Sequence, residues 1–210
     1  GATARKLCRA APLPEVCAKA VMVDVAAALG RLHSHGLLHR DVKAENVIVS
    51  YQGSSYLCDF GISAHEEELR ARGLMQFRAG TPDHMAPEIT SKFRIPHFTQ
   101  KVDVWAFGIF VLELARGNTP LEERRCGNRV EAMLEITSVN AAPAVPRCRG
   151  FSSSFVDFVE NCLVRDPAKR HTIHEVLQSG YLRHAGGRAY IAVQRHLASP
   201  DVRRQLEQDS

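Results

Sequence analysis

The residues of this sequence best suited to chemistry are Asp41, Lys43, Asn46 and Asp59, which lie near its start. The amide oxygen of Asn46 and the carboxylate of Asp59 suit a hard cation such as Mg²⁺, which takes few protein ligands and completes its shell with water and phosphate oxygens. Asp41 can accept a hydrogen bond from an alcohol, and Lys43 can balance charge on a phosphoryl group in transfer. Together these side chains predict phosphoryl transfer to a hydroxyl group.

A β-hairpin is the element expected to bring Asn46 and Asp59 together. The β-branched run at 47–49 is followed by turn residues at 52–54 and by a second extended run at 55–58. Because paired strands lie about 4.8 Å apart, residues at the open end of such a hairpin approach each other. The hairpin therefore allows both side chains to hold one cation.

Two long apolar segments predict buried helices beside this hairpin. The first spans 14–34, starts with a proline and an acid, and has Asp24 as the only charge in its middle. The second spans 102–116, is apolar on all sides and stops at Gly117, so it must be central. Two shorter amphipathic helices are expected farther along the chain, at 151–163 and 172–177.

Composition is that of an ordinary globular protein able to form one good-sized domain. The 210 residues (23.3 kDa) are 45% hydrophobic and 24% charged, and no apolar run approaches the ~20 residues needed to cross a bilayer. The net charge of +4 is spread along the chain, so we expect neither nucleic acid nor membrane as a partner. Six cysteines without C-x-x-C spacing predict reduced thiols, and the absence of a signal peptide at the start agrees with a cytoplasmic location.

Three short motifs, in this order, resemble those of protein kinases. The stretch 39–46 (HRDVKAEN) resembles the catalytic loop, 59–61 (DFG) the metal-binding loop, and 86–88 (APE) the end of the activation segment. Each triplet alone is weak, but the ordered set is specific. Additional matches are GTPxxMAPE at 80–88, DxWxxG at 103–108 and DPxxR at 166–170.

The resemblance covers residues 1 to 182 and is greatest to the STE group, which contains members of mitogen-activated kinase cascades. It implies a mainly α fold, that of the large (C-terminal) lobe of a kinase, with long buried central helices and one or two short β-hairpins. It also implies ATP and Mg²⁺ as cofactors and a protein with serine or threonine acceptors as substrate. Signalling-cascade proteins are possible partners.

The resemblance assigns catalytic and binding roles to individual residues. Asp41 would orient the substrate hydroxyl with Lys43 beside it, and Asn46 and Asp59 would hold Mg²⁺. Ile48 would form the floor of the adenine site. Binding of the nucleotide as a whole is assigned to Lys43, Glu45, Asn46, Ile48, Cys58 and Asp59.

Structural roles follow from the same resemblance. Asp103 would accept hydrogen bonds from the backbone of the catalytic loop, although its place at the start of a helix also suits an N-terminal cap. Thr81 would lie near Asp41. Arg170 would pair with Glu88 in a desolvated bridge that pins the activation segment to the core.

A whole kinase also has a smaller β-rich lobe with a glycine-rich loop and a phosphate-binding lysine, and this sequence contains neither. We therefore expect a large lobe alone at 1–183, with the N-terminal β lobe absent, and a helical extension at 184–210. Either the other lobe was omitted from the sequence, or the chain is a non-catalytic interaction or scaffold module. The extension carries apolar residues at helical spacing and is expected to pack on the lobe or to dock a partner; they are Tyr190, Ile191, Val193 and Leu197.

Within the kinases, Lys43 two residues after Asp41 matches the serine/threonine pattern. The segment 62–79 is polar and is expected to be an irregular loop. Its only hydroxyl residue is Ser63, and Phe77 occupies the usual phosphothreonine position of the STE group. One of the acids at 66–68 could therefore pair with Arg40 in place of a phosphate, or the three could form a solvated turn.

Overall fold

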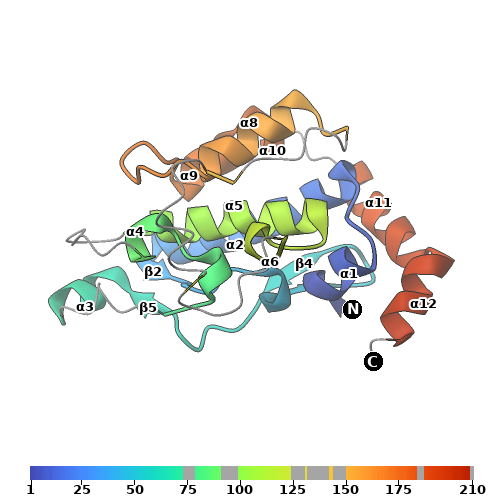
Figure 1. Ribbon diagram of the computed structural model, residues 1–210, viewed down its shortest axis with the longest axis horizontal. Helices are drawn as coiled ribbons and strands as arrows, with labels where there is room; N and C mark the ends of the chain where they lie inside the picture. Colours follow the sequence, from blue (N-terminus) through green and yellow to red (C-terminus); the bar gives the residue numbers. More distant parts are fainter. Residues whose placement is uncertain are drawn as a thin grey trace.

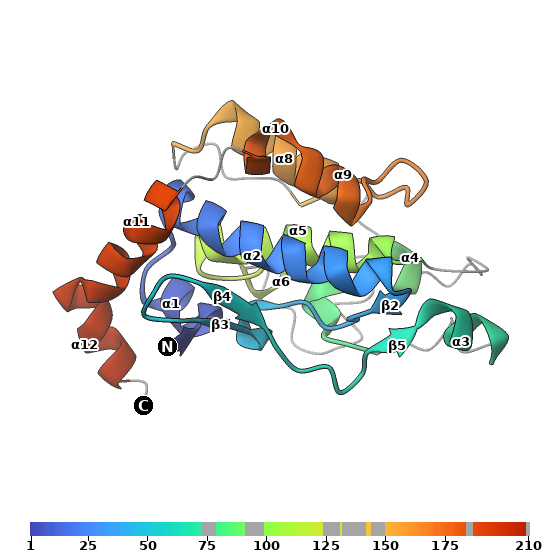
Figure 2. The same cartoon turned by 180° about the vertical axis from the view of Figure 1, so that it is seen from behind.

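The computed structural model describes residues 1–72, 79–90, 99–123, 131, 142–143, 150–183 and 187–208. Two long helices, α2 (Glu15–Ser34) and α5 (Lys101–Arg116), lie in contact at its centre (Figure 1). Helices from late in the sequence cover one side of this pair, and the strands with their loops lie on the other (Figure 2). The predicted catalytic residues therefore lie on the strand side of the central helices.

The central helices confirm the sequence prediction to within one residue at each start. Every side chain of α5 from Val102 to Ala115 is buried, as expected for a helix that is apolar on all sides. The helix ends at Gly117, whose φ of 87° is left-handed and whose N–H donates to the carbonyl of Glu113. In α2, the side chains of Val21, Val25 and Leu29 are fully buried, as expected for a helix with a single charge in its middle.

The predicted hairpin is present and is part of a slightly larger sheet. Strands β3 (Val47–Val49) and β4 (Ser55–Leu57) pair antiparallel, with Val47 opposite Leu57. A two-residue strand that the sequence pattern did not indicate, β1 (Ala2–Thr3), pairs with the other edge of β3. Val47, Val49 and Leu57 face the core, whereas Ile48 and Tyr56 lie opposite each other on the exposed face.

The expectation of an irregular loop over 62–79 is wrong for its first half. Strand β5 (Ala64–His65) pairs antiparallel with β2 (Leu37–Leu38), and α3 (Glu66–Ala71) follows directly. The three acids begin this helix, where the positive end of its dipole favours negative charge. Residues 73–78, including Phe77, lie outside the described part of the chain.

Three helices cover the other side of α2 and α5 (Figure 1): α8 (Ser153–Cys162), α9 (Ile173–Gln178) and α10 (Gly180–Arg183). The first two confirm the predicted helices at 151–163 and 172–177. Their starts are set by local polar residues, because the Ser152 hydroxyl accepts from the N–H of Phe155 and Thr172 forms a capping box with Glu175. The apolar sides of these helices extend the core.

The extension forms α11 (Gly187–Ala198) and α12 (Pro200–Gln208). Helix α11 packs on α2, and the Tyr190 hydroxyl donates to Asp24 at 2.8 Å. The other oxygen of Asp24 accepts from the N–H of Ser55 in β4 at 2.7 Å. The apolar residues expected to pack do so at Val193 and Leu197, but Ile191 points outward, and Ala189 takes a place in the core.

The remaining described elements are short: α1 (Ala4–Ala10), η1 (Ala44–Asn46), η3 (Pro82–His84), α4 (Pro87–Thr90) and α6 (Pro120–Glu123). Cysteines 8, 17, 58 and 162 are free thiols, and burial raises the pKa of Cys162 to about 12. Cys126 and Cys148 lie outside the described residues. Within the described residues, every helix is too short or too polar to cross a membrane.

Candidate active site

The side chain of Asp41 lies at the centre of the site. Its Oδ1 accepts hydrogen bonds from the hydroxyl and the N–H of Thr81, at 2.8 and 3.0 Å. Its Oδ2 lies 2.7 Å from Lys43 Nζ and accepts from the Asn46 amide at 3.0 Å. The structure thus brings together three of the residues that the sequence singled out.

The charge state of Asp41 follows from these contacts. Burial alone would raise the pKa of its carboxyl, but hydrogen bonds from Lys43 and Thr81, together with the Lys43 charge, outweigh burial and lower the pKa. Asp41 is therefore a carboxylate at neutral pH. An ionised carboxylate accepts hydrogen bonds only, which is the property needed to orient an incoming hydroxyl.

Asp103 of α5 anchors the backbone of the catalytic loop. Its two oxygens accept the backbone N–H groups of His39 and Arg40, both at 2.8 Å, and one of them also lies 2.9 Å from the ring of His33. Asp103 is the third residue of α5, whose N-cap is Gln100, so the capping alternative is wrong. These contacts hold Arg40 at a φ of 70°, a region that non-glycine residues rarely adopt.

His39 connects the catalytic loop to the segment at 58–60. Its Nδ1 accepts the N–H of Asp41, so its Nε2 carries the proton and donates to the carbonyl of Cys58 at 3.1 Å. The ring also lies edge-on to Phe60 with 5.1 Å between centroids. Burial lowers the pKa of His39 despite the carboxylates nearby, so a neutral imidazole joins the two segments.

Asp59 and Asn46 lie at the open end of the hairpin, as the sequence predicted. The N–H of Cys58 donates to the carbonyl of Asn46 at 2.8 Å, which fixes the residue before Asp59 beside Asn46. The Asn46 side-chain nitrogen donates to both the carbonyl and the carboxylate of Asp41, so its oxygen is the atom left for a cation. The Asp59 carboxylate is exposed, and this pair of oxygen ligands suits Mg²⁺.

The other predicted nucleotide residues lie in and next to the hairpin. Ile48 is 42% exposed on the outer face of β3, where its cross-strand neighbour Tyr56 is 57% exposed. Cys58 is half-buried just beyond this face, next to Asp59. Glu45 is turned toward α1, and its carboxylate lies 3.3 Å from Arg5 Nε. Of the predicted nucleotide residues in and next to the hairpin, it is the one whose side chain is bound to another element.

The segment that carries Thr81 crosses directly over the catalytic loop. Gly80 has a φ of 104°, and a Cβ there would lie 2.4 Å from the carbonyl oxygen of Arg40. Only glycine permits this approach. Close contact of the two segments is what places the Thr81 hydroxyl on Asp41.

The end of the same segment is pinned by the predicted ion pair. Arg170 and Glu88 form two hydrogen bonds, of 2.6 and 2.9 Å, and both side chains are almost fully buried. Arg170 also donates to the carbonyls of Val164 and Lys101, so its charge has several partners. The bidentate geometry confirms the predicted bridge.

The acids of α3 do not pair with Arg40. Glu66 lies 2.8 Å from Arg70 and Glu68 lies 3.0 Å from Arg72, both four residues apart on the same helix. The predicted replacement of a phosphate contact is therefore wrong. Because the segment becomes helical, its own arginines are the nearer partners.

A buried acid in α5 is a part of the site that motif reasoning missed. The fully buried Glu113 carboxylate accepts from Arg5 of α1, from the N–H of Ala44 and from the ring of His84. Burial would raise the pKa of Glu113, but His84 and Arg5 outweigh burial and lower it. Glu113 is, besides Asp103, the other acid of the otherwise apolar stretch 102–115 of α5, and this was the signal that could have revealed the cluster.

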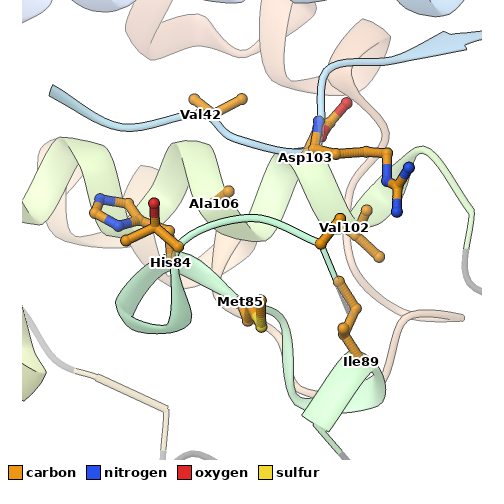
Figure 3. A pocket seen from close by; sticks show the side chains of 10 residues that line it. Val42, His84, Met85, Ile89, Val102, Asp103 and Ala106 are labelled. Carbon is orange, nitrogen blue, oxygen red and sulfur yellow. The ribbon is translucent and has the colours of Figure 1, made fainter. Parts of the chain in front are cut away.

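A small cavity of about 20 Å³ separates the segment after Gly80 from α5. Figure 3 shows Val42 and Ala106 above the cavity, and His84, Met85 and Ile89 along the opposite side. The cavity is too small for a nucleotide. Its lining includes Arg40 and Asp103, so it lies within the contacts that support the catalytic loop.

The fold and this site together define the large lobe of a protein kinase: two central helices, a catalytic loop held by Asp103, a hairpin with oxygen ligands at its open end, and a segment pinned by Arg170. Residues 1–182 match the family model described as "Protein kinase domain". The chain belongs to that family.

Curated relatives agree with the resemblance to the STE group. The chain is 36% identical over 174 residues to the human (Homo sapiens) serine/threonine-protein kinase PAK 4, covering 82% of the chain and 28% of that protein. It is 34% identical over 164 residues to STE20 of Saccharomyces cerevisiae (78% and 16%), also a serine/threonine-protein kinase. It is 32% identical over 178 residues to the dual specificity mitogen-activated protein kinase kinase 7 of Rattus norvegicus (82% and 41%).

The chain therefore spans less than half the length of each of these relatives. Members of this family use ATP and Mg²⁺. The oxygens of Asn46 and Asp59 fit that ion, because both are hard ligands and neither residue needs a thiolate or imidazole partner.

Proposed function

We propose that this chain is the catalytic large lobe of an ATP-dependent protein kinase that transfers the γ-phosphate of ATP to serine or threonine hydroxyls of a protein substrate. The observation that carries the proposal is the cluster of Asp41, Lys43 and Thr81. A hydroxyl already lies 2.8 Å from the Asp41 carboxylate, and Lys43 Nζ lies within 2.7 Å of both the hydroxyl and the carboxylate. A substrate hydroxyl would meet the same acceptor.

Each residue has a defined part in this proposal. Asp41 accepts the hydrogen bond of the acceptor hydroxyl and orients its oxygen, and Lys43 balances the charge that develops on the transferred group. Asn46 and Asp59 hold Mg²⁺, which neutralises charge on the phosphates when it is bound. Ile48 and Cys58 provide the apolar surface for the adenine base. Glu45 takes part in the nucleotide site indirectly, through its ion pair with Arg5.

Serine and threonine are proposed as acceptors because Lys43 follows Asp41 by two residues, the pattern of that class. PAK 4 and STE20 are named serine/threonine kinases, whereas the rat relative is named a dual specificity kinase. Partners in a signalling cascade are part of the same proposal. Phosphoamino-acid analysis of the product shows whether the acceptors are serine and threonine alone or include tyrosine, and so separates a serine/threonine kinase from a dual specificity kinase.

The test is transfer of labelled phosphate from ATP to casein, with the protein expressed from its complete coding sequence. We expect Asp41→Asn to lower the rate by about 10²- to 10⁴-fold, because the amide is a poorer acceptor for the hydroxyl proton. Asp201→Asn is the matched control, since Asp201 is exposed on α12 and, within the part of the chain that the structure describes, pairs with Arg204 alone. Equal rates for the wild type and Asp41→Asn would contradict the proposal.

The alternative is a kinase-derived module that binds partners without catalysis. One observation favours it: Ile48 and Tyr56 on the outer face of the hairpin, and Phe60 beyond its end, are exposed in the described structure. Binding of Mg²⁺ and ATP separates the two functions, because a ligand that binds the folded state raises the melting temperature. A melting temperature unchanged by saturating Mg²⁺ and ATP, with no phosphate transfer, would establish the module.

A further inference from the structure

Helix α11 presents three different sides to its surroundings. Ala189, Val193 and Leu197 are buried, whereas Tyr190 and Gln194 bond to Asp24 and to the carbonyl of Gln52. The third side carries Arg188, Ile191, Ala192, Arg195 and His196, which follow the i, i+3, i+4, i+7, i+8 spacing of one helical stripe. Residues of this third side line an open groove.

The groove lies between this side of α11 and the start of α2, two segments that Figures 1 and 2 both show next to each other. Its volume is about 520 Å³. Val16 of α2 and Ile191 of α11 line it and are 45% and 48% exposed. Two large aliphatic side chains therefore meet water in one concave place, which is uncommon unless the surface binds something.

The charges of the groove are positive and unpaired. Arg188 and Arg195 line it, both are exposed, and neither forms an ion pair or side-chain hydrogen bond within the described structure. Glu15, which lies between Pro14 and Val16 of the lining, is turned away, because its carboxylate accepts from Ser152 and Tyr181. The Glu15 carboxylate therefore does not repel an anionic ligand in the groove.

A buried polar atom in the same groove also lacks a partner. The Nε2 of His196 is buried without a hydrogen-bond partner, and burial lowers the pKa of this ring, so it is neutral. Unsatisfied buried polar groups are costly in native proteins. Because it is neutral, the ring adds no charge of its own to the groove, and Arg188 and Arg195 are the charged side chains of its lining.

The spacing of the arginines defines the ligand further. Arg188 and Arg195 are seven residues apart on one helix, hence about 10 Å along its axis. In an extended peptide of polyproline II conformation, which has three residues per turn, residues three positions apart lie on the same side and are separated by about 9 Å. Two acids at that spacing could each meet one arginine, and an apolar side chain between them would lie at Ile191 and Val16.

We propose that the groove between α2 and α11 docks a short extended segment of a partner protein, in which an apolar residue lies between two acidic residues three positions apart. The apolar residue packs on Val16 and Ile191, and the acids pair with Arg188 and Arg195. This docking surface is formed by α2 and by the extension, so it is separate from the residues proposed for catalysis.

Fluorescence anisotropy tests the proposal with the protein expressed from its complete coding sequence. The probe is a labelled peptide mixture that has Glu at both acidic positions and Leu, Ile or Phe between them. Matched mixtures carry Lys at the acidic positions or Ser at the apolar one. We expect the first mixture to bind about tenfold or more tightly than either control mixture, since each control removes either ion pairs or the buried side chain.

Variants assign the binding to this groove. Ile191→Asp should weaken binding of the acidic mixture by about tenfold or more, and the pair Arg188→Glu with Arg195→Glu should invert the preference toward the lysine mixture. Arg203→Glu changes an exposed side chain of α12, outside the groove, so it is the matched control and should leave binding unchanged. The changed side chains are all exposed, so unchanged melting temperatures verify folding.

Three results would overturn the proposal. The first is absence of binding by the acidic mixture, and the second is binding that Ile191→Asp and the double reversal leave unchanged. The third is that an oligothymidylate or phosphatidylserine vesicles bind through Arg188 and Arg195 without loss in Ile191→Asp, because the surface would then recognise phosphate charge alone.

Discussion

Asp41 and Asp59 are the two acids of the candidate site, and their surroundings are opposite. Asp41 is held by Thr81, Lys43 and Asn46, and its loop is fixed by Asp103 beneath it. Asp59 is exposed, has a left-handed φ of 62°, and accepts one long hydrogen bond, from the N–H of Gly61 at 3.3 Å. The side of the site that would orient the hydroxyl is complete within this chain, whereas the side that would hold the metal and nucleotide is open.

The difference divides the site into groups that also stabilise the fold and groups that serve ligand binding alone. Buried, fully bonded groups contribute to the stability of the fold as well as to the chemistry, so they are rigid before any ligand arrives. Exposed ligands contribute little to folding and depend on the bound ion for their own order. Four measurements test this division.

The largest effect is expected at Arg170, which anchors the bonded side. Arg170→Ala leaves Glu88 as a buried charge without its partner, so we expect the free energy of unfolding to fall by about 3–5 kcal/mol. Arg204→Ala, which breaks an exposed pair with Asp201, is the control and should change it by less than about 0.5 kcal/mol. Urea denaturation measures both, and equal losses would contradict the division.

The two acids themselves provide the next comparison. Asp41→Asn removes charge-assisted hydrogen bonds and should cost about 1.5–3 kcal/mol in urea denaturation. Asp59→Asn should cost less than about 0.5 kcal/mol, because asparagine accepts the left-handed backbone and the side chain is exposed. A larger loss for Asp59→Asn than for Asp41→Asn would reverse our interpretation.

Acid should remove the contribution of Asp41. Its pKa is lower in the folded protein than in the unfolded chain, so the unfolded state binds the proton more readily and stability falls with falling pH. Asp41 contributes its full stabilisation above the pKa of the unfolded chain, about 3.9. This stabilisation is lost as the pH falls through the lower pKa of the folded protein. The stability difference between wild type and Asp41→Asn should therefore narrow below about pH 4, and a constant difference would exclude this assignment.

The smallest effect is expected where the extension meets α2. Tyr190→Phe removes the hydroxyl that donates to Asp24 and keeps the ring, so it should cost about 1 kcal/mol. Tyr51→Phe, an exposed tyrosine in the hairpin turn, is the control and should have no effect. A loss in the control equal to that in Tyr190→Phe would show that the bond to Asp24 is not its source.

Much of this architecture could be predicted from local patterns. The helices at 15–34 and 101–116 have long apolar periodicity, and the hairpin has two β-branched or extended runs around a turn, so both are visible in sequence. Kinase-like motifs predicted two further features, the bridge between Glu88 and Arg170 and the role of Asp103, because each of these residues occupies a fixed position in such a motif.

The features that were missed depend on contacts between distant residues. Strands of two residues, such as β2 and β5, have no periodicity to detect. The contact of Arg5 with Glu113 joins residues 108 apart in the chain, and neither belongs to a motif that we used. The ion pair predicted for Arg40 failed because helix formation at 66–71 gave two of the acids nearer partners.

The hydrogen bonds of Asp24 have a practical consequence for any shortened version of this protein. Asp24 is the only charge in the middle of α2, and one of its two oxygens is occupied by Tyr190 of the extension. Ending the chain at residue 182, where the family match ends, would remove that partner and uncover the buried side of α2 that α11 protects. Recombinant versions that retain α11 should therefore be the more soluble ones, and residue 198 is the earliest sensible place to stop.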